Sequence, residues 1–300
     1  MKYHLSWILH LLYIIVFFSD NVYTSTPFYT SSQNLFNSLT YGHNANIRPD
    51  SNVRVSVSLA VTSVNYLDIG TGKFSVTGWF SVSWVDTAFV WTPSNHGNVD
   101  YLFLTKEYCW KPQLAVENTA DEFEILDDVS QQMRVDSSGS VVWEPGGVFT
   151  VHCEVDPTYF PYDRQTCYIR LTSAAYDNTE VTLSHNSTSI KLDNVIDHDE
   201  WTVFETTTET EDQLDLHGKF PKTLLKFTFK LQRNCSFYLW MLLVPYFLVS
   251  SLGLVVFILP STKGEKSSFS LRIIILDVIS LAMFTSLIPL TKGKLPAISK

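Results

Sequence analysis

The stretch CEVDPTYFPYDRQTC, residues 153–167, decides the fold. Two cysteines enclose thirteen residues, and an aromatic–proline–aromatic–acid run, residues 160–163, lies between them. Both flanks alternate apolar and polar side chains as strands do, and the enclosed residues favour turns. A disulfide between Cys153 and Cys167 is therefore the favoured pairing. Closing so short a loop should stabilise the fold by about 3 kcal/mol if the bond acts by restricting the unfolded chain.

The other two cysteines, Cys109 and Cys235, leave three pairings formally open for the four thiols. Because these two lie far apart in the sequence, we expect both to be free and buried. A disulfide needs an oxidising compartment, and the N-terminus predicts one. Lys2 precedes an apolar run, residues 5–18, which is shorter than a membrane span and is followed by small or polar residues. Residues 1–25 are thus predicted to be a signal peptide, with a membrane anchor as the alternative.

The composition excludes several classes of function. Apolar residues make up 45% and charged residues 17% of the 300 residues, which favours a folded chain of about two domains over a disordered one. The net charge of −9 argues against nucleic acid and permits a cationic ligand or ion. The sequence has no metal-ligand cluster, phosphate-binding loop or nucleophile–base arrangement, so we expect neither a cofactor nor an enzyme.

Residues 26–235 predict an extracellular β domain. Apolar and polar residues alternate along short runs separated by Gly, Pro, Asn and Asp, which is typical of a two-sheet antiparallel sandwich. The runs are residues 53–61, 74–76, 79–84, 148–155, 167–171, 181–183 and 225–231. A short amphipathic helix is predicted over residues 32–39, and Asn186 begins a glycosylation sequon. Immunoglobulin-type adhesion domains share this outline, but they join their sheets through widely spaced cysteines.

Residues 236–300 predict a membrane region of at least two α-helices. Residues 237–259 contain 23 positions without a charge, enough to span a bilayer. The second apolar run, residues 267–290, contains Arg272 and Asp277, and charged residues inside a span face protein or water. The alternative is an amphipathic segment that does not span. If the run spans, several copies would surround a pore, and one stripe of side chains would line it: Glu265, Ser268, Arg272, Ile275, Ile279, Ala282 and Ser286.

These motifs resemble those of Cys-loop (pentameric ligand-gated) receptor subunits, most closely the nicotinic acetylcholine receptor group of invertebrates. The cysteine pair enclosing Phe-Pro-x-Asp is the signature of that family. Further matches follow in chain order: Trp79 to Asp86 with Trp91, Trp110 to Pro112 with Asn118 and Asp121, Ser137 to Pro145, and then Pro245, Pro260, Gly264 to Lys266 and Pro289. The resemblance implies about ten strands followed by four membrane helices, with five subunits around the pore. The chain ends at Lys300, before a third or fourth helix, so we expect either a fragment or a truncated product.

The resemblance also implies a ligand site between subunits, where aromatic rings hold a cationic neurotransmitter. One subunit supplies the principal face. At the three loops of that face this chain has Glu117, Ala174 and the tyrosine-free segment 205–218. The neighbouring subunit supplies the complementary face, which is better kept, at Trp79, Val142 and Glu144. Strand alternation would equally place Trp79 in the sandwich core. We therefore expect a non-α-like subunit that offers a complementary face.

Signal transmission and ion selectivity are implied in the same way. The loop tip, Phe160 and Pro161, is expected to rest on the membrane helices, and Asp163 is expected to pair with Arg233; the alternative is two solvated charges. Glu265 at the cytoplasmic mouth is typical of cation-selective relatives. Five copies of Arg272 in the pore would instead oppose cation flow, because a guanidinium keeps its charge.

The sequence thus predicts a subunit of a neurotransmitter-gated, nicotinic-type cation channel in the neuronal or postsynaptic plasma membrane. It would assemble with other receptor subunits in a heteropentamer. The alternative is a non-conducting binding or regulatory subunit. A third possibility, an anion channel of the same family, lacks the inserted residues of anion-selective relatives.

Overall fold

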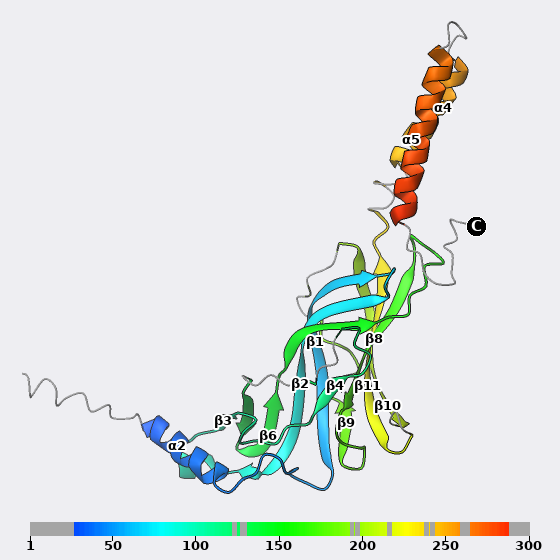
Figure 1. The fold of residues 1–300 in the computed structure, drawn as a ribbon. Helices are drawn as coiled ribbons and strands as arrows, with labels where there is room; N and C mark the ends of the chain where they lie inside the picture. The colour runs from blue at the N-terminus through cyan, green and yellow to red at the C-terminus, as the bar shows by residue number, and fades with distance from the viewer. Residues whose placement is uncertain are drawn as a thin grey trace, which may run out of the picture.

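The computed structural model describes residues 27–121, 125–126, 131–192, 195, 199–214, 218–236, 240, 244–258 and 265–287, with the side chains of 256–258, 265 and 283–287 left aside. Within these residues the predicted all-β sandwich with a short N-terminal helix is confirmed (Figure 1). The helix α2 (Pro27–Thr40) is longer than predicted and buries Leu35. The predicted signal peptide and residues 288–300 lie outside the described residues.

Two sheets form the sandwich. The larger has the strand order β3-β5-β6-β2-β1-β9, and β7 also pairs with β2. Its strands are β1 (Val53–Asp68), β2 (Lys73–Val90), β3 (Tyr101–Leu104), β5 (Met133–Asp136), β6 (Ser138–Trp143), β7 (Gly146–His152) and β9 (Val181–His185). The smaller sheet has the order β10-β11-β8-β4. Its strands are β4 (Leu114–Val116), β8 (Arg164–Ser173), β10 (Trp201–Leu214) and β11 (Pro221–Arg233).

The core lies between the sheets and follows from the period-two alternation, because successive strand side chains point to opposite faces. Aromatic rings from the two sheets meet there. The Phe74 and Phe229 ring centroids are 5.3 Å apart, and those of Phe80 and Phe227 are 5.6 Å apart. These four residues are 1% exposed or less. Burial of such large apolar side chains is the main force that holds the sheets together.

Three details of the predicted strands need correction. The runs 74–76 and 79–84 belong to one strand, β2, because β2 pairs with β1, β6 and β7 along its length. The run 148–155 ends at His152, and Cys153 leaves the strand with its N–H bonded to the carbonyl oxygen of Gly72 at 2.8 Å. Most of the segment expected as the third loop is strand, since residues 205–214 pair with β11.

The helices α4 (Val244–Ile258) and α5 (Glu265–Leu287) lie beyond the end of the sandwich that is opposite to α2 (Figure 1). They pack against each other, and Ile273 of α5 is buried next to Gly253 of α4. Both helices are shorter among the described residues than the predicted runs. None of the described helices combines the length and the apolar character that a membrane crossing needs.

Candidate functional site

The disulfide loop forms as predicted. Cys153 and Cys167 are bonded, with their Cα atoms 5.1 Å apart. Cys109 and Cys235 are free, and Cys109 is buried as expected. The expectation that Cys235 is also buried was wrong: it is half-buried, because it lies two residues after Arg233, the last residue of β11, where the chain leaves the sandwich.

The predicted pair of Asp163 and Arg233 is a buried, bidentate ion pair. Arg233 Nε lies 2.7 Å from Asp163 Oδ1, and Nη2 lies 3.2 Å from Oδ2. Asp163 is 1% exposed and Arg233 4%, so the alternative of two solvated charges is wrong. Two parallel N–H···O bonds fix both direction and distance, which a single charge contact does not.

Sequence reasoning missed three further members of this cluster. Gln165 Nε2 donates to Asp163 Oδ2 at 2.7 Å, and Arg233 Nη1 donates to Glu200. The guanidinium also lies 4.2 Å from the centroid of the Trp201 ring. We call Asp163, Gln165, Glu200, Trp201 and Arg233 the arginine cluster. Trp201 is the first residue of β10 and Glu200 directly precedes it, and no spacing in the sequence links them to Arg233.

The tip of the disulfide loop differs from the expectation in one respect. Phe160 is buried, and its ring centroid lies 5.1 Å from the Arg233 guanidinium, so it packs inward on the arginine cluster. The aromatic side chains exposed at the tip are Tyr159 and Tyr162, at 73% and 63%. The contact predicted between Phe160, Pro161 and the membrane helices is replaced, for Phe160, by this inward packing.

The three residues predicted for the complementary face lie together on one face of the larger sheet. Val142 of β6 pairs with Ser83 of β2, four residues after Trp79 on the same side of that strand. Val142 is half-buried, and Glu144, two residues later, is exposed. Trp79 is 52% exposed, so the alternative of a core residue is wrong. Its ring lies over its cross-strand partner Gly146, where a Cβ atom would be 2.4 Å from Trp79 Cε3.

The same sheet face carries further aromatic residues that sequence reasoning missed. Tyr101 and Phe103 of β3 are exposed, with ring centroids 5.8 Å apart in an edge-to-face arrangement. The guanidinium of Arg134 lies 4.1 Å from the Tyr101 ring centroid, and Arg134 pairs with Val142 across the strands. We call Trp79, Tyr101, Phe103, Arg134 and Val142 the Trp79 face. Exposed aromatic and arginine side chains are enriched where proteins contact partners.

Polar contacts occupy the positions expected for the principal face. Glu117 accepts a hydrogen bond from Gln213 Nε2 at 3.0 Å and lies 3.9 Å from Arg170 Nη1. The carbonyl oxygen of Ala174 accepts a hydrogen bond from Lys222 Nζ at 3.0 Å. The first two predicted loop positions therefore carry a carboxylate and an alanine, each bound by the hairpin of β10 and β11.

Comparison with known proteins agrees with this arrangement. Residues 32–235 match the family described as "Neurotransmitter-gated ion-channel ligand binding domain". The chain belongs to this family. The predicted resemblance to Cys-loop receptor subunits is thereby confirmed, and the family is one of ion-channel receptors and not of enzymes.

The relatives of this receptor chain are acetylcholine receptor subunits. It is 28% identical over 283 residues to "Acetylcholine receptor subunit alpha-like 2" of Drosophila melanogaster, covering 90% of this chain and 49% of the relative. It is 28% identical over 273 residues to human "Neuronal acetylcholine receptor subunit alpha-2", covering 89% and 51%. It is 26% identical over 265 residues to chicken "Neuronal acetylcholine receptor subunit beta-4", covering 86% and 55%. The chain spans about half the length of the curated relatives it matches.

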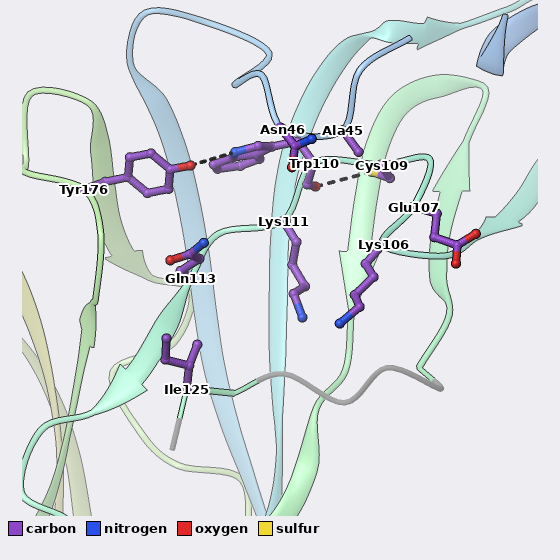
Figure 2. Close-up of a pocket in the computed structure, with 10 residues that line it drawn as sticks. All are labelled: Ala45, Asn46, Lys106, Glu107, Cys109, Trp110, Lys111, Gln113, Ile125 and Tyr176. Carbon is purple, nitrogen blue, oxygen red and sulfur yellow. Dashed lines mark hydrogen bonds between the residues drawn. The ribbon is translucent and has the colours of Figure 1, made fainter. Parts of the chain in front are cut away.

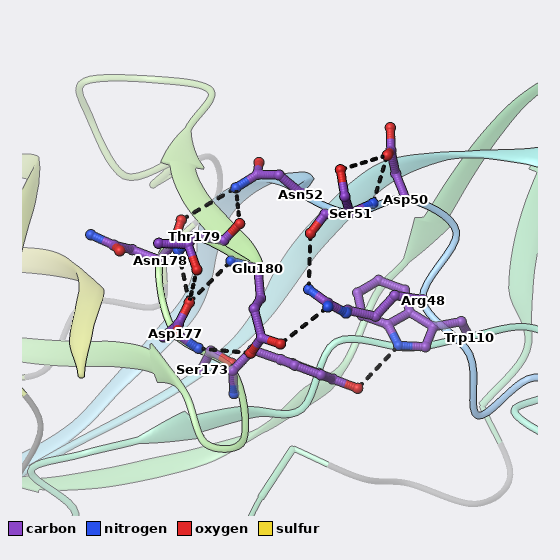
Figure 3. Close-up of polar contacts among 11 residues, drawn as sticks. Arg48, Asp50, Ser51, Asn52, Trp110, Ser173, Asp177, Asn178, Thr179 and Glu180 are labelled. Carbon is purple, nitrogen blue, oxygen red and sulfur yellow. Dashed lines mark hydrogen bonds and ion pairs between the residues drawn. The ribbon is translucent and has the colours of Figure 1, made fainter. Parts of the chain in front are cut away.

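Figure 3 shows a polar network that includes Arg48, Trp110 and Glu180. Tyr176, two residues after Ala174 in the receptor chain, belongs to this network. Its hydroxyl accepts a hydrogen bond from Trp110 Nε1 at 3.2 Å, and the Arg48 guanidinium lies 5.5 Å from its ring centroid. Arg48 Nη2 in turn lies 3.1 Å from Glu180 Oε1. In the same loop the hydroxyl of Thr179 bonds to the Asp177 carboxylate, and this contact lowers the pKa of Asp177 below its ordinary value of 3.8. The network ties the loop after β8 to the segment before β1.

A pocket of about 420 Å³ lies between the segment after α2 and the connection from β3 to β4 (Figure 2). It is lined by Ala45, Asn46, Lys106, Glu107, Cys109, Trp110, Lys111, Gln113, Ile125 and Tyr176. None of the residues predicted to contact a ligand is among them. Burial raises the pKa of the Cys109 thiol, with a smaller contribution from the Asp86 carboxylate, so the thiol stays protonated at neutral pH.

The predicted pore stripe occupies one side of α5. The side chains of Ser268, Arg272, Ile275, Ile279 and Ala282 are all exposed. Glu265 and Ser286 lie within α5, but their side chains are outside the described residues. Asp277 is half-buried and shares a side with Ile273, which contacts α4, as expected for a residue off the stripe. The asparagine of the predicted sequon, Asn186, is exposed just after β9.

Proposed function

We propose that this chain is a subunit of a nicotinic-type, neurotransmitter-gated cation channel in the neuronal or postsynaptic plasma membrane. Its sandwich would be extracellular, and α4 and α5 would cross the membrane. The observation that carries this proposal is the arginine cluster, which joins the disulfide loop, the start of β10 and the last residue of β11. These three segments meet where the sandwich ends and the chain continues toward α4.

The arginine cluster supports a coupling role for Phe160, Pro161, Asp163 and Arg233. Because Arg233 is the last residue of β11, a displacement of that strand moves the guanidinium. The bidentate bonds to Asp163 then move the disulfide loop with it. If the disulfide loop stayed in place while β11 moved, the two buried charges would be separated, which costs several kcal/mol of free energy.

The Trp79 face supports binding to a neighbouring subunit. It is exposed, aromatic and cationic, while the principal positions of this chain are occupied by its own polar contacts. We therefore propose that Trp79, Val142 and Glu144 form a complementary face, and that another receptor subunit in a pentamer supplies the principal face. A small cationic neurotransmitter would bind between them, held in part by Trp79 through cation–π attraction.

The exposed stripe of α5 supports a pore-lining role, with Glu265 at the cytoplasmic mouth attracting cations. The alternative of a non-conducting regulatory subunit is not favoured, since the relatives are named as receptor subunits. Arg272 on the stripe would lower cation flow, and each further copy of this chain in the pentamer would raise the electrostatic barrier.

Co-expression with a nicotinic α subunit tests the proposal. We expect the chain alone to bind no acetylcholine and the co-expressed pair to bind it and to give agonist-evoked currents. Trp79→Ala in the pair should weaken acetylcholine binding roughly 2- to 30-fold, the worth of one cation–π contact. Tyr41→Ala removes an exposed ring outside the Trp79 face and serves as the control. Saturable acetylcholine binding by the chain alone would contradict the complementary role.

The predicted glycan tests whether the sandwich lies on the extracellular side of the membrane. Asn186 is exposed, so we expect a glycosidase to lower the apparent mass of the chain expressed in animal cells. Thr188→Ala removes the sequon and should abolish this shift. A Thr188→Ala chain that still shows the shift would place the glycan elsewhere.

A further inference from the structure

The hairpin of β10 and β11 is tied to the rest of the sandwich by two of its own side chains. Gln213 and Lys222 are cross-strand partners near the tip of this hairpin. Gln213 Nε2 donates to Glu117 Oε1 at 3.0 Å. Lys222 Nζ donates to the carbonyl oxygens of Ser173 and Ala174, at 3.1 and 3.0 Å. Both ties therefore reach Glu117 and Ala174, two of the positions expected for the principal face.

The contact of Lys222 has the chemistry of a cation site. Two carbonyl oxygens at the end of β8 converge on one ammonium, which has three N–H donors. Hydrogen bonds from a charged donor are about twice as strong as those between neutral groups. Lys222 is half-buried, so water screens these bonds less than it would at an open surface.

The surroundings of this ammonium favour positive charge. An adjoining pocket of about 260 Å³ is lined by Ala175, Tyr176, Asp177, Glu180, Phe220 and Lys222. Two of these residues are carboxylates, and one of them, Glu180, already pairs with Arg48. The pocket thus combines acidic and aromatic residues around a cation that belongs to the chain itself.

We propose that the Lys222 ammonium serves as the built-in cation of this face, a specificity-determining residue that excludes an external cationic ligand from the Ser173 and Ala174 carbonyls. It also holds the hairpin against the end of β8 without any ligand. An external ammonium would have to displace a donor that is covalently attached and always present at high effective concentration. This inference deepens the proposed complementary role by giving the reason why the other face takes no cation.

Amide hydrogen exchange on the full chain in lipid nanodiscs, without partner or ligand, tests the tie. Lys222→Met keeps the aliphatic stem and removes the three donors. We expect the amides of residues 212–214 and 223–225 to exchange about 10- to 100-fold faster, the effect of losing charge-assisted hydrogen bonds on local opening. Lys222→Arg keeps donors of the same charge and should retain most of the protection.

Lys226→Met is the matched control. Lys226 lies four residues further along the same side of β11, and its ammonium pairs with Glu211 at 3.4 Å at the surface, so its loss should change exchange less than about threefold. Unchanged exchange in Lys222→Met, or equal acceleration in Lys226→Met, would overturn the proposal. Because no neighbouring subunit, agonist or current enters this measurement, its failure is distinguishable from a failure of the channel assay.

Discussion

The arginine cluster allows a quantitative prediction about an asymmetric pair of substitutions. Arg233→Met removes the guanidinium and leaves the Asp163 carboxylate, 1% exposed, with only the Gln165 side chain among the hydrogen-bond partners described above. An uncompensated buried charge costs about 3–5 kcal/mol of unfolding free energy. Asp163→Asn is milder, because Arg233 keeps the Glu200 carboxylate and the Trp201 ring. We expect it to cost about 1–3 kcal/mol, the range for a lost hydrogen bond to a charged group.

The double variant separates the interaction energy of Asp163 and Arg233 from the contributions of their neighbours. If the two side chains interact as the bidentate geometry indicates, Arg233→Met combined with Asp163→Asn should cost less than the sum of the single changes by at least about 1 kcal/mol. Urea unfolding of the full chain in detergent, followed by tryptophan fluorescence, measures these differences. Trp201, whose ring centroid is 4.2 Å from the guanidinium, reports directly on the cluster.

A half-buried arginine with a longer ion-pair contact provides the control for this cycle. The Arg170 side chain is 36% exposed and lies 3.9 Å from Glu117, so Arg170→Met should cost less than about 1 kcal/mol. A coupling energy near zero between Arg233 and Asp163 would refute the reasoning. So would an Arg233→Met chain as stable as Arg170→Met.

Three further predictions follow. Gly146→Ala should displace the Trp79 ring, since the new Cβ atom would lie 2.4 Å from it. We expect this variant to weaken ligand binding as Trp79→Ala does and to leave the melting temperature nearly unchanged. A ligand affinity equal to that of the wild-type receptor would contradict this prediction. Asp177→Asn should lower the melting temperature at pH 7, because a carboxylate whose pKa is lowered by folding stabilises the fold above its ordinary pKa of 3.8. The difference in melting temperature between variant and wild type should vanish as the pH falls through the folded-state pKa, below 3.8. A difference that stays constant with pH would count against this prediction. Arg272→Ser should raise the single-channel cation conductance of co-expressed receptors, and an unchanged conductance would remove the blocking role.

Local patterns in the sequence were sufficient for the β-sandwich. Period-two alternation predicts strands wherever one face is buried, so the sandwich followed from runs such as residues 53–61. The disulfide of Cys153 and Cys167 was also predictable, because both cysteines belong to one short loop between strands. The partner of Asp163 required the family resemblance, since Arg233 lies 70 residues away.

Alternation could not predict which face of β2 is covered. It assigns Trp79 to one side of the strand, and only the strand pairing shows that this side is open and that the ring rests on Gly146. For the same reason Glu200, Trp201 and Lys222 gave no signal in the sequence, because their partners come from other strands. Residue spacing along the chain determined the secondary structure, the sandwich and the disulfide loop of this protein. The buried charges and the polar ties of the hairpin were decided by tertiary structure, since hydrogen bonds and ion pairs depend on distances between segments that the order of residues does not contain.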